Sequence, residues 1–454
     1  MKRSLLIALP LAFASQAQAI PFASDLLYHL DAASVVVDGA NNVSQWTDQS
    51  GNGLHFVQSD AARRPSAAGA SINGLPTINF GGNEELVLSA ATSPRTFIAV
   101  TRVNTGGGLR GIWGDENGDK GVRLDSTTFY RSAGHNTDGN DFANGDPAGV
   151  RVNGEITGAY TVGTAHIIDE VRGPALAGGG NFNDTSAGQY FSGRDYLGDV
   201  AEIAVYDRVL SRKERYEVEQ FLAAKYALTL AQQNGAPVSG LLGNDLTDLG
   251  NNGNEAVYNG VNLGGFDAVF FGNHEPFFNG AEGAFNVFDN LKGGTVNKWC
   301  CDSADVAGGR FVGADFTSLL PANVKGYVLD RFTLSSDNDS GISRDPDHWA
   351  IEGSNDGVTW NTIYLYNKPG DSIFDNFSGV GPDNLTVEFE AGVDYATPVA
   401  YKRFRYHAFS SVNNSTHSIS ELEFFGTPHI IPEPATAGLA LAALALMARR
   451  RRSA

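Results

Sequence analysis

The stretch DHWAIEGSNDGVTWNTIYLY, residues 347–366, has the pattern of two β-strands joined by a tight turn. Aromatic and β-branched residues, which fit the pleated and half-buried surface of a sheet, lie on both sides of the turn. Within the turn, Asn355, Asp356 and Gly357 tolerate the positive φ angles that a hairpin connection requires. The stretch therefore predicts a β-hairpin.

Short runs of the same kind precede and follow this hairpin. They are RTFIAVTRV (95–103), AHIIDEVRG (165–173), GDVAEIAVYD (198–207), YKRFRYHAF (401–409) and ISELEFFG (419–426). The 54 glycines and the 18% of charged residues indicate many turns between short strands. No unit of roughly 20 to 50 residues repeats, which argues against a solenoid or a propeller.

The sequence therefore predicts an all-β protein with two tandem β-sandwich (jelly-roll) domains. The first domain is expected over residues 20–230 and the second over residues 241–428. Residues 231–240, AQQNGAPVSG, are polar, contain glycine and proline and show no periodicity, so they are predicted to form a linker.

One helix is expected at the end of the first domain, over SRKERYEVEQFLAAKYAL (211–228). Ser211 and Glu214 have the spacing of a capping box, in which each side chain satisfies a backbone amide of the first turn. An apolar stripe at helical spacing follows, made of Val218, Phe221, Leu222 and Tyr226. The pattern predicts a closing helix that packs on the first domain.

Both ends of the chain carry targeting patterns. At the N-terminus, MKRS, an apolar run from Leu5 to Ala14 and the small residues of SQAQA predict a secretory signal peptide over residues 1–19. At the C-terminus, the fourteen residues from Ala435 to Ala448 span about 21 Å as a helix, which is less than a hydrocarbon core of about 30 Å. This segment is expected to pause in a membrane; a marginal, uncleaved anchor is the alternative.

The chain is acidic, with a formal net charge of -19. Such a surface repels phosphate backbones and anionic lipids, so nucleic acid is not an expected partner. Neutral sugars bind through stacking and hydrogen bonds and need no net charge. Carboxylate groups also attract calcium.

The two cysteines, Cys300 and Cys301, are adjacent. Three states are open: reduced and packed beside Trp299, joined as a vicinal disulfide, or reactive toward another molecule. A zinc site is not expected, because there is no second cysteine pair and neither His274 nor His348 has a ligand-like spacing to this one.

No catalytic residue is predicted. The chain lacks the H-E-x-x-H and G-x-S-x-G motifs and a phosphate-binding glycine loop. DENGDKG (115–121) alternates oxygen ligands but lacks the glycine and glutamate positions of an EF-hand, so it is interpreted as an acidic hairpin turn, with a weak metal site as the alternative.

The first domain resembles the concanavalin A-like, laminin-G-like modules of secreted bacterial proteins. The resemblance rests on YHLDAASVVVDGANNVSQWTDQSGNGLHFVQ (28–58), LPTINFGG (75–82) and GDVAEIAVYDRVLSRKERYEVEQFLAAKYAL (198–228). It implies a jelly-roll sandwich, a fold that serves both lectins and hydrolases.

The second domain resembles the discoidin, or coagulation-factor type C, family of galactose-binding-like domains. The matching pieces are FDN…T…KW (288–299), FTLSSDNDSGISRDPDHWAIEGSNDGVTW (332–360), YKRFRYHAF (401–409) and SELEFFG (420–426). The resemblance implies a calcium ion, with Asp289, Thr295 and Glu421 at the matching positions. The insert LKGG (291–294) departs from the family pattern.

The C-terminus, residues 432–454, resembles the PEP-CTERM sorting signal of Gram-negative bacteria that produce exopolysaccharide. The resemblance rests on Pro432, Glu433 and Pro434, the apolar run, and Arg449, Arg450, Arg451 and Arg452. It implies processing by an exosortase after transient contact with the inner membrane, and a final location on the cell surface or in the extracellular matrix.

Sugar recognition needs planar hydrogen-bonding groups on loops beside an apolar surface. The candidates are Arg344, Asp345, His348, Asn413, Asn414 and His417, although each can also serve a turn or the core. The leading hypothesis is a non-enzymatic exported protein that binds extracellular polysaccharide. The alternatives are a polysaccharide hydrolase or lyase, and a structural biofilm protein.

Overall fold

The computed structural model describes residues 19–115, 120–125, 128–131, 150–155, 158–171, 185–189, 193–247, 268–273, 282–293, 297–338, 341–376, 382–413 and 416–431. They form two compact units, the first built mainly from residues before 231 and the second mainly from residues 231 onward. The predicted signal peptide up to residue 18 and the whole C-terminal signal, 432–454, lie outside the described residues.

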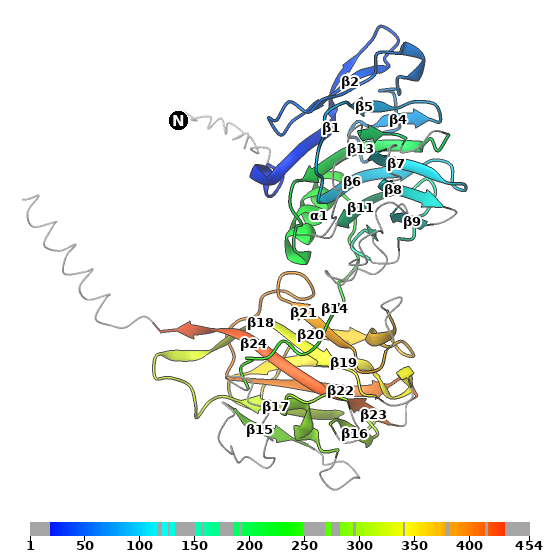
Figure 1. Ribbon diagram of the computed structural model, residues 1–454. Coiled ribbons are helices and arrows are strands. Elements are labelled where there is room, and N and C mark those ends of the chain that lie inside the picture. Colours follow the sequence, from blue (N-terminus) through cyan, green and yellow to red (C-terminus); the bar gives the residue numbers. More distant parts are fainter. Residues whose placement is uncertain are drawn as a thin grey trace, which may run out of the picture. The chain divides into compact units, whose positions relative to one another are not determined.

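Antiparallel strands form one thirteen-stranded sheet (Figure 1), whose residues belong to the first unit except for Thr128–Arg131 and Arg151–Val152, which are grouped with the second. The strands are β1 (Leu26–Val37), β2 (Val43–Asp48), β3 (Phe56–Val57), β4 (Ile78–Gly81), β5 (Leu86–Leu88), β6 (Thr96–Val103), β7 (Arg110–Asp115), β8 (Lys120–Asp125), β9 (Thr128–Arg131), β10 (Arg151–Val152), β11 (Ala165–Val171), β12 (Thr185–Ala187) and β13 (Leu197–Tyr206). Their order in the sheet is β10-β11-β6-β13-β1-β2-β3-β5-β12-β7-β8-β9, and β4 also pairs with β13.

The helix α1 (Arg212–Tyr226) begins one residue after the predicted cap and lies within the predicted range. It buries Val218, Leu222 and Tyr226 in a core that also contains residues of β6, β11 and β13. Arg215, which was not among the residues of the predicted stripe, is also buried and pairs with Asp169 of β11 at 2.8 Å. The predicted closing helix is therefore confirmed, and it packs through both apolar and charged contacts.

The second unit contains the remaining strands (Figure 1). They are β14 (Ala236–Val238), β15 (Val269–Gly272), β16 (Trp299–Asp302), β17 (Arg310–Asp315), β18 (Val324–Ser335), β19 (Pro346–Ser354), β20 (Asn361–Asn367), β21 (Thr386–Glu390), β22 (Arg403–Ser411), β23 (His417–Ile419) and β24 (Glu421–Ile430). One sheet has the order β14-β21-β18-β24 and another the order β15-β17-β22-β19-β20, while β16 pairs with β23.

Aromatic side chains from both larger sheets fill one core in this unit. Phe332 of β18 stacks on Phe389 of β21 with ring centroids 4.6 Å apart, and the edge contact from Phe332 to Trp349 of β19 joins the two sheets at 6.3 Å. Because the inner faces of two sheets meet in this way, the unit is a β-sandwich. The predicted all-β fold class is confirmed.

The hairpin predicted over residues 347–366 is present as β19 and β20. Its turn is closed by the carboxylate of Asp356, which accepts hydrogen bonds from the amides of Val358 and Thr359. These bonds, that from Thr359 first, lower the pKa of Asp356 to about 2. Gly357 takes a φ of 76°, as the turn pattern required.

The segment predicted as a linker, 231–240, contains the short strand β14, which pairs with β21. Propensity alone did not show this strand, because β pairing is decided by the partner strand. Short 3-10 helices are η1 (Ala23–Asp25), η2 (Ala61–Arg63), η5 (Ala284–Phe288), η6 (Gly341–Arg344) and η7 (Ile373–Asn376). Within the described ranges, no helix has both the length and the apolar character needed to span a membrane.

Candidate functional site

The outer face of the five-stranded sheet of the second unit carries aromatic and charged side chains. Successive residues of a strand point to opposite faces. Along β22, Phe404 and Tyr406 are buried in the core, so Arg405, His407 and Phe409 lie on the other face. Neighbouring strands add similar residues there. We call this set the aromatic face; its members are Phe271, Phe311, His348, Glu352, Trp360, Arg405, His407 and Phe409.

The rings of the aromatic face form a continuous series across the sheet. The centroid separations are 5.8 Å for Phe271–Trp360, 6.3 Å for Phe271–Phe311, 5.8 Å for Phe311–His407, 4.2 Å for His407–Phe409 and 4.6 Å for His348–Phe409. All of these rings except that of His407 are half-buried, so parts of them face solvent.

Gly313 of β17 leaves room for the ring of Phe271 to lie over this neighbouring strand. A Cβ atom on Gly313 of β17 would lie 2.5 Å from Cζ of Phe271 and 2.8 Å from Cβ of Arg405. Real Cβ atoms do not approach so closely, so a larger residue would displace the Phe271 ring. The sequence therefore shapes the aromatic face through this small residue as well as through the large ones.

Arg405 lies at the centre of the aromatic face. Its guanidinium carbon is 4.2 Å from the ring centroid of Trp360 and 4.6 Å from that of Phe311, which are cation–π distances. Its Nε donates to Oε2 of Glu352 at 2.6 Å. Among the described residues, its two terminal nitrogens and Oε1 of Glu352 have no protein partner. Donors and an acceptor are therefore left for a ligand.

His407 connects the Arg405–Glu352 pair to the backbone just before strand β17. Its Nδ1 lies 3.0 Å from Oε2 of Glu352 and its Nε2 lies 2.9 Å from the carbonyl oxygen of Gly308. The imidazole of His407 therefore bridges the Glu352 carboxylate and the backbone of Gly308. Burial alone would raise the pKa of Glu352, but the hydrogen bonds from His407 and Arg405 outweigh burial and lower it.

Of the predicted sugar-binding residues, His348 belongs to the aromatic face. Its ring contacts Phe409, and it is half-buried. Burial lowers its pKa, and the nearby carboxylate of Asp347 opposes that shift. The imidazole is thus favoured in its neutral form, which offers one donor and one acceptor to a ligand.

Arg344, Asp345 and Asn413 lie close together in the second unit but are not part of the aromatic face. The amide of Asn413 donates to the carbonyl oxygen of Ser343 at 3.1 Å, and the amide of Val412 donates to that of Asp345 at 3.0 Å. Asp345 is 1% exposed, and burial raises its pKa to about 7 against a hydrogen bond from Ser372. That burial keeps its carboxyl group away from a surface ligand.

Two predicted sugar-binding residues remain, His417 and Asn414. His417 is 2% exposed, its Nε2 lies 2.8 Å from the hydroxyl of Tyr406, and its ring packs against Trp299. Burial lowers its pKa to about 3. The structure thus places His417 in the core, while Asn414 lies outside the described residues.

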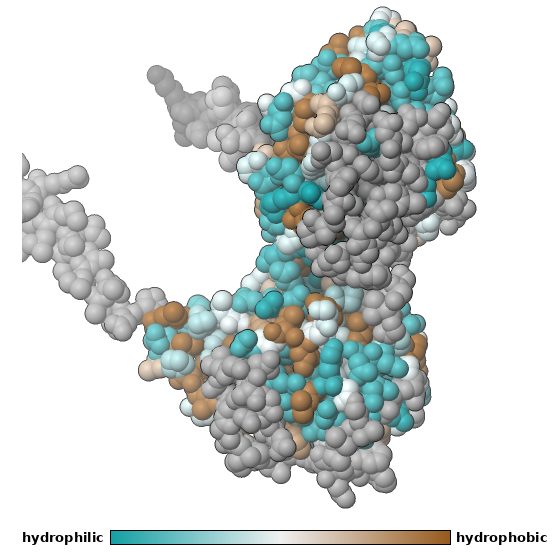
Figure 2. All heavy atoms as spheres, in the orientation of Figure 1, coloured by the Kyte–Doolittle hydropathy of each residue, from teal (hydrophilic) through white to brown (hydrophobic). Residues whose placement is uncertain are grey.

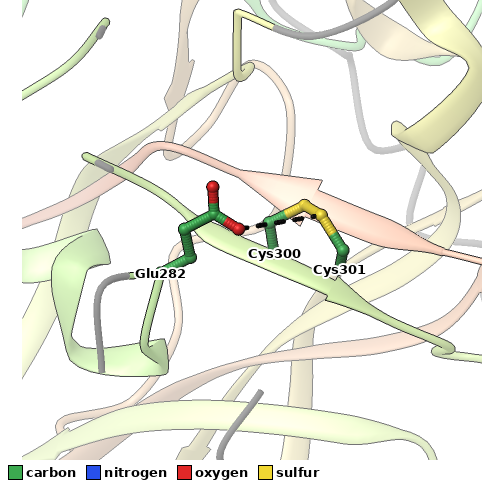
Figure 3. Close-up of side chains that lie close together, drawn as sticks. All are labelled: Glu282, Cys300 and Cys301. Atoms are coloured by element: carbon green, nitrogen blue, oxygen red, sulfur yellow. Dashed lines mark hydrogen bonds between the residues drawn. A yellow bond between two sulfur atoms is a disulfide. The ribbon is translucent and has the colours of Figure 1, made fainter. Parts of the chain in front are cut away.

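The two cysteines form a vicinal disulfide on β16. Figure 3 shows the carboxylate of Glu282 directed toward it, with Oε2 3.9 Å from Sγ of Cys301. Nη1 of Arg344 lies 3.5 Å from Sγ of Cys301 and 3.7 Å from Sγ of Cys300. Two opposite charges therefore flank the disulfide. Glu282 was not predicted, because it is 18 residues upstream and carries no motif.

The predicted calcium ligand Glu421 lies in a buried acidic cluster. It is 1% exposed, and its Oε2 has no hydrogen-bond partner among the described residues. Burial raises its pKa, the charges of Asp289, Asp245 and Glu423 raise it further, and the backbone amide of Asn290 opposes them. A buried carboxylate near other carboxylates is the type of oxygen ligand that a hard cation prefers, but among the described residues Glu421 does not belong to a set of three acidic, histidine or cysteine ligand atoms within 4.8 Å of one another. The third predicted ligand, Thr295, lies outside the described residues.

A groove of about 940 Å³ lies at another part of the second unit. Its lining includes Lys325 and Lys402 as well as Val399 and Ile431, but no phenylalanine, tyrosine or tryptophan. Figure 2 shows hydrophobic residues gathered where β24 ends, and Ile430 and Ile431 are exposed there. Without an aromatic ring to stack on, this groove is less suited to sugar than the aromatic face.

Of the residues in the aromatic face, only His348 was predicted from the sequence as a sugar-binding residue. The usable signal was the period-2 pattern of YKRFRYHAF, in which Arg405, His407 and Phe409 alternate with core residues. Phe271, Phe311 and Trp360 gave no such signal, since their positions next to Arg405 depend on the strand order β15-β17-β22-β19-β20.

No protein-family model matches the chain, and no curated protein matches it. Solved structures that resemble part of it include the carbohydrate-binding module CBM32-3 of a family 31 glycoside hydrolase from Clostridium perfringens, at 16% identity, over 36% of this chain and 96% of that one, with a TM-score of 0.25. CBM62 from Clostridium thermocellum Xyl5A shows 17% identity over 35% of this chain and 94% of its own, with a TM-score of 0.25.

The family 32 module of Clostridium perfringens NanJ, solved in complex with galactose, shows 14% identity over 35% of this chain and 93% of its own, with a TM-score of 0.22. The structures that the chain resembles are thus carbohydrate-binding modules. At these TM-scores, the similarity establishes neither a shared fold nor a shared ligand.

Proposed function

We propose that this chain is an exported protein that binds a polysaccharide on the aromatic face of its second unit, without catalysis. The observation that carries the proposal is the arrangement around Arg405. Half-buried rings surround a charge pair in which the terminal guanidinium nitrogens and Oε1 of Glu352 have no partner among the described residues.

This arrangement supplies both kinds of contact that a sugar requires. Aromatic rings offer apolar surface for the C–H faces of a pyranose. Guanidinium and carboxylate groups are planar and bind adjacent hydroxyl groups through paired hydrogen bonds. Because the rings extend across several strands, the face suits several consecutive sugar units of one chain.

The charge state of Glu352 favours binding over hydrolysis. A glycosidase needs a carboxylic acid whose raised pKa keeps it protonated as a proton donor. Glu352 is the only carboxyl group in the aromatic face as defined, and its pKa is lowered by His407 and Arg405. It therefore stays ionised and accepts hydrogen bonds.

The test is affinity gel electrophoresis of the mature chain in galactan, galactomannan, xyloglucan, β-1,3-glucan, alginate and pectin. We expect at least one polymer to retard migration, and Trp360→Ala to weaken that binding about tenfold, or about 1.4 kcal/mol. Val358→Ala is the matched control, since Val358 lies in the same turn and is 83% exposed. Retardation by none of the polymers, or equal retardation of both variants, contradicts the proposal.

The same gels separate binding from enzymatic activity. A binding protein leaves the polymer intact, so no new reducing ends should appear during long incubation with the retarding polymer. Release of reducing ends that is lost in Glu352→Gln would instead identify a hydrolase, and release of unsaturated ends a lyase.

A calcium ion bound by Glu421 and Asp289 is the second part of the proposal. It is supported by Oε2 of Glu421, which has no hydrogen-bond partner in the part of the chain that the structure describes, and the ion would neutralise repulsion among the nearby carboxylates. Calorimetric titration of the calcium-free chain should give one site that is lost in Glu421→Gln and kept in Asp356→Asn, whose carboxylate closes an exposed turn. A site that persists in Glu421→Gln excludes these ligands.

The third part concerns the destination of the protein. The signal-peptide pattern, the Pro432-Glu433-Pro434 motif and the short apolar tail support export, exosortase processing and release to the surface or matrix. Mass spectrometry of the mature protein from its host should find a C-terminus near Pro434. A mature chain that still ends in Arg452-Ser453-Ala454 would exclude processing.

A further inference from the structure

We propose that the Cys300–Cys301 disulfide, with Glu282, is a redox-controlled site for a thiophilic divalent cation such as Zn²⁺ or Cd²⁺. In the oxidised form the sulfurs are bonded to each other and offer no thiolate. Once reduced, the two sulfurs and one carboxylate oxygen would form the ligand set. This proposal is independent of polysaccharide binding.

The geometry brings three suitable ligand atoms together. One oxygen of Glu282 and the Sγ atoms of Cys300 and Cys301 all lie within 4.8 Å of one another. Ligands of one zinc ion lie about 2.0 to 2.3 Å from the metal and thus at most about 4.6 Å apart. The three atoms are therefore close enough to share an ion after small movements.

Two contacts hold Glu282 in place, one to its backbone carbonyl and one to its oxygen Oε1. Its backbone carbonyl accepts a hydrogen bond from the amide of Cys300 at 3.2 Å, and its Oε1 lies 3.7 Å from Nζ of the buried Lys298. Its other oxygen, Oε2, faces Cys301 (Figure 3). A disulfide sulfur carries no hydrogen, so that contact does not satisfy Oε2 in the oxidised form.

Arg344 favours the reduced, ionised form of the pair. Its Nη1 lies within 3.7 Å of both sulfurs. A guanidinium beside a sulfur stabilises a thiolate, which makes that sulfur a better leaving group in exchange and a better metal ligand afterwards. Cys301 is partly exposed while Cys300 is fully buried, so a reductant reaches Cys301.

The reduction needs two equivalents of a thiol, or one dithiol. A reductant thiolate attacks Sγ of Cys301, the S–S bond breaks, and Cys300 leaves as a thiolate. A second reductant thiol then releases Cys301 and forms the reductant disulfide, so two electrons pass to the protein. Binding of the cation displaces any protons held by the two thiols, and these pass to solvent.

The test is titration of the mature chain with Cd²⁺ in saturating Ca²⁺, followed by the ultraviolet absorption of cadmium–thiolate bonds. The calcium keeps oxygen-only sites filled, and the absorption reports sulfur ligation alone. After reduction with dithiothreitol and its removal without air, we expect one Cd²⁺ per chain with this absorption. The oxidised chain should give none.

Variants assign the ligands. Glu282→Gln keeps both cysteines and should weaken Cd²⁺ binding about tenfold, or about 1.4 kcal/mol. Asp305→Asn, an exposed carboxylate close to Cys301 in sequence, should have no effect. Cys301→Ser should abolish the absorption, and circular dichroism checks that this variant is folded.

Three results would overturn the proposal. They are the absence of cadmium–thiolate absorption in the reduced chain, the same absorption without reduction, and unchanged affinity in Glu282→Gln. The last result would leave a two-sulfur site without the carboxylate, which is not the site proposed.

Discussion

Glu202 in the first unit and Glu421 in the second are buried to the same degree but have opposite surroundings. Each is 1% exposed and lies on a long strand, β13 or β24. Glu202 meets Nζ of Lys225 at 2.6 Å, Nε2 of His29 at 2.6 Å and the hydroxyl of Tyr226 at 2.8 Å. Glu421 instead lies among carboxylates.

The two pKa values shift in opposite directions. Burial raises both, but for Glu202 the hydrogen bonds and charges of His29 and Lys225 outweigh burial, so its pKa is lowered. For Glu421 the charges of Asp289 and Asp245 add to the effect of burial, so its pKa is raised. Neighbours therefore decide whether the ionised form of a buried carboxylate is favoured or disfavoured.

Neighbouring Glu423 sharpens the contrast on β24 itself. Its carboxylate accepts hydrogen bonds from the amides of Leu242 and Gly243 and from the hydroxyl of Thr333. Two residues away, Oε2 of Glu421 has no hydrogen-bond partner within the described ranges. The acidic character of the strand therefore does not separate the two glutamates, but the distribution of hydrogen-bond donors does.

The largest expected effect is that of Glu202→Gln. It leaves Lys225 and His29 without their shared buried anion, so the free energy of unfolding should fall by about 3 kcal/mol. Urea denaturation of the mature chain followed by circular dichroism measures the loss. Glu421→Gln in the presence of a calcium chelator is the comparison, and it should cause no loss because it removes a repelled charge. An equal loss in the free energy of unfolding for both variants would contradict the proposed difference between Glu202 and Glu421.

The next effect is that of calcium. At a free concentration of about 100 times its Kd, the ion should stabilise the chain by about 2.7 kcal/mol. Thermal unfolding with and without chelator should show the rise in Tm for the wild type and for Glu202→Gln, but not for Glu421→Gln. A rise that survives Glu421→Gln would place the ion elsewhere.

The pH dependence should also separate the two glutamates. The pKa of Glu202 is lowered in the folded state, so its contribution is present above its unfolded pKa of about 4.5 and is lost as the pH falls further. The pKa of Glu421 is raised, so without calcium its contribution is present below about 4.5 and is lost as the pH rises through the folded value.

Hydrogen exchange read by mass spectrometry measures this difference in the chelated chain. Corrected for intrinsic exchange rates, protection of the β24 peptides should increase from pH 7 to pH 5, by on the order of 1 kcal/mol per pKa unit of displacement. Protection of the β13 peptides should not increase in that interval and should fall below about pH 4.5. Calcium should remove the change in β24, and parallel changes in both strands would contradict the assignment.

The smallest effect is expected for Lys225→Met. Its ammonium group is partly exposed and is shared with Asp31, and His29 and Tyr226 stay bonded to Glu202. The loss in free energy of unfolding should therefore be about 1 kcal/mol or less. Urea denaturation measures it. A loss as large as that of Glu202→Gln would mean that Lys225 alone compensates the buried anion.

Local patterns predicted the features whose cause is local. The hairpin of β19 and β20 followed from Asn355, Asp356 and Gly357, and the helix α1 followed from the spacing of Val218, Leu222 and Tyr226. The roles of Asp289, Thr295 and Glu421 as calcium ligands stay predictions. The buried pair Arg215–Asp169 was missed, because its partners are 46 residues apart.

The sequence by itself determined the all-β class, the closing helix and the hairpin turn at Asn355–Gly357, because turn geometry and side-chain periodicity act over a few residues. Only the tertiary structure decided that Trp360 and Phe311 enclose Arg405, that Glu282 faces the Cys300–Cys301 disulfide, and that Oε2 of Glu421 finds no donor among the described residues. These contacts depend on strand order and register, which bring together residues that are far apart along the chain.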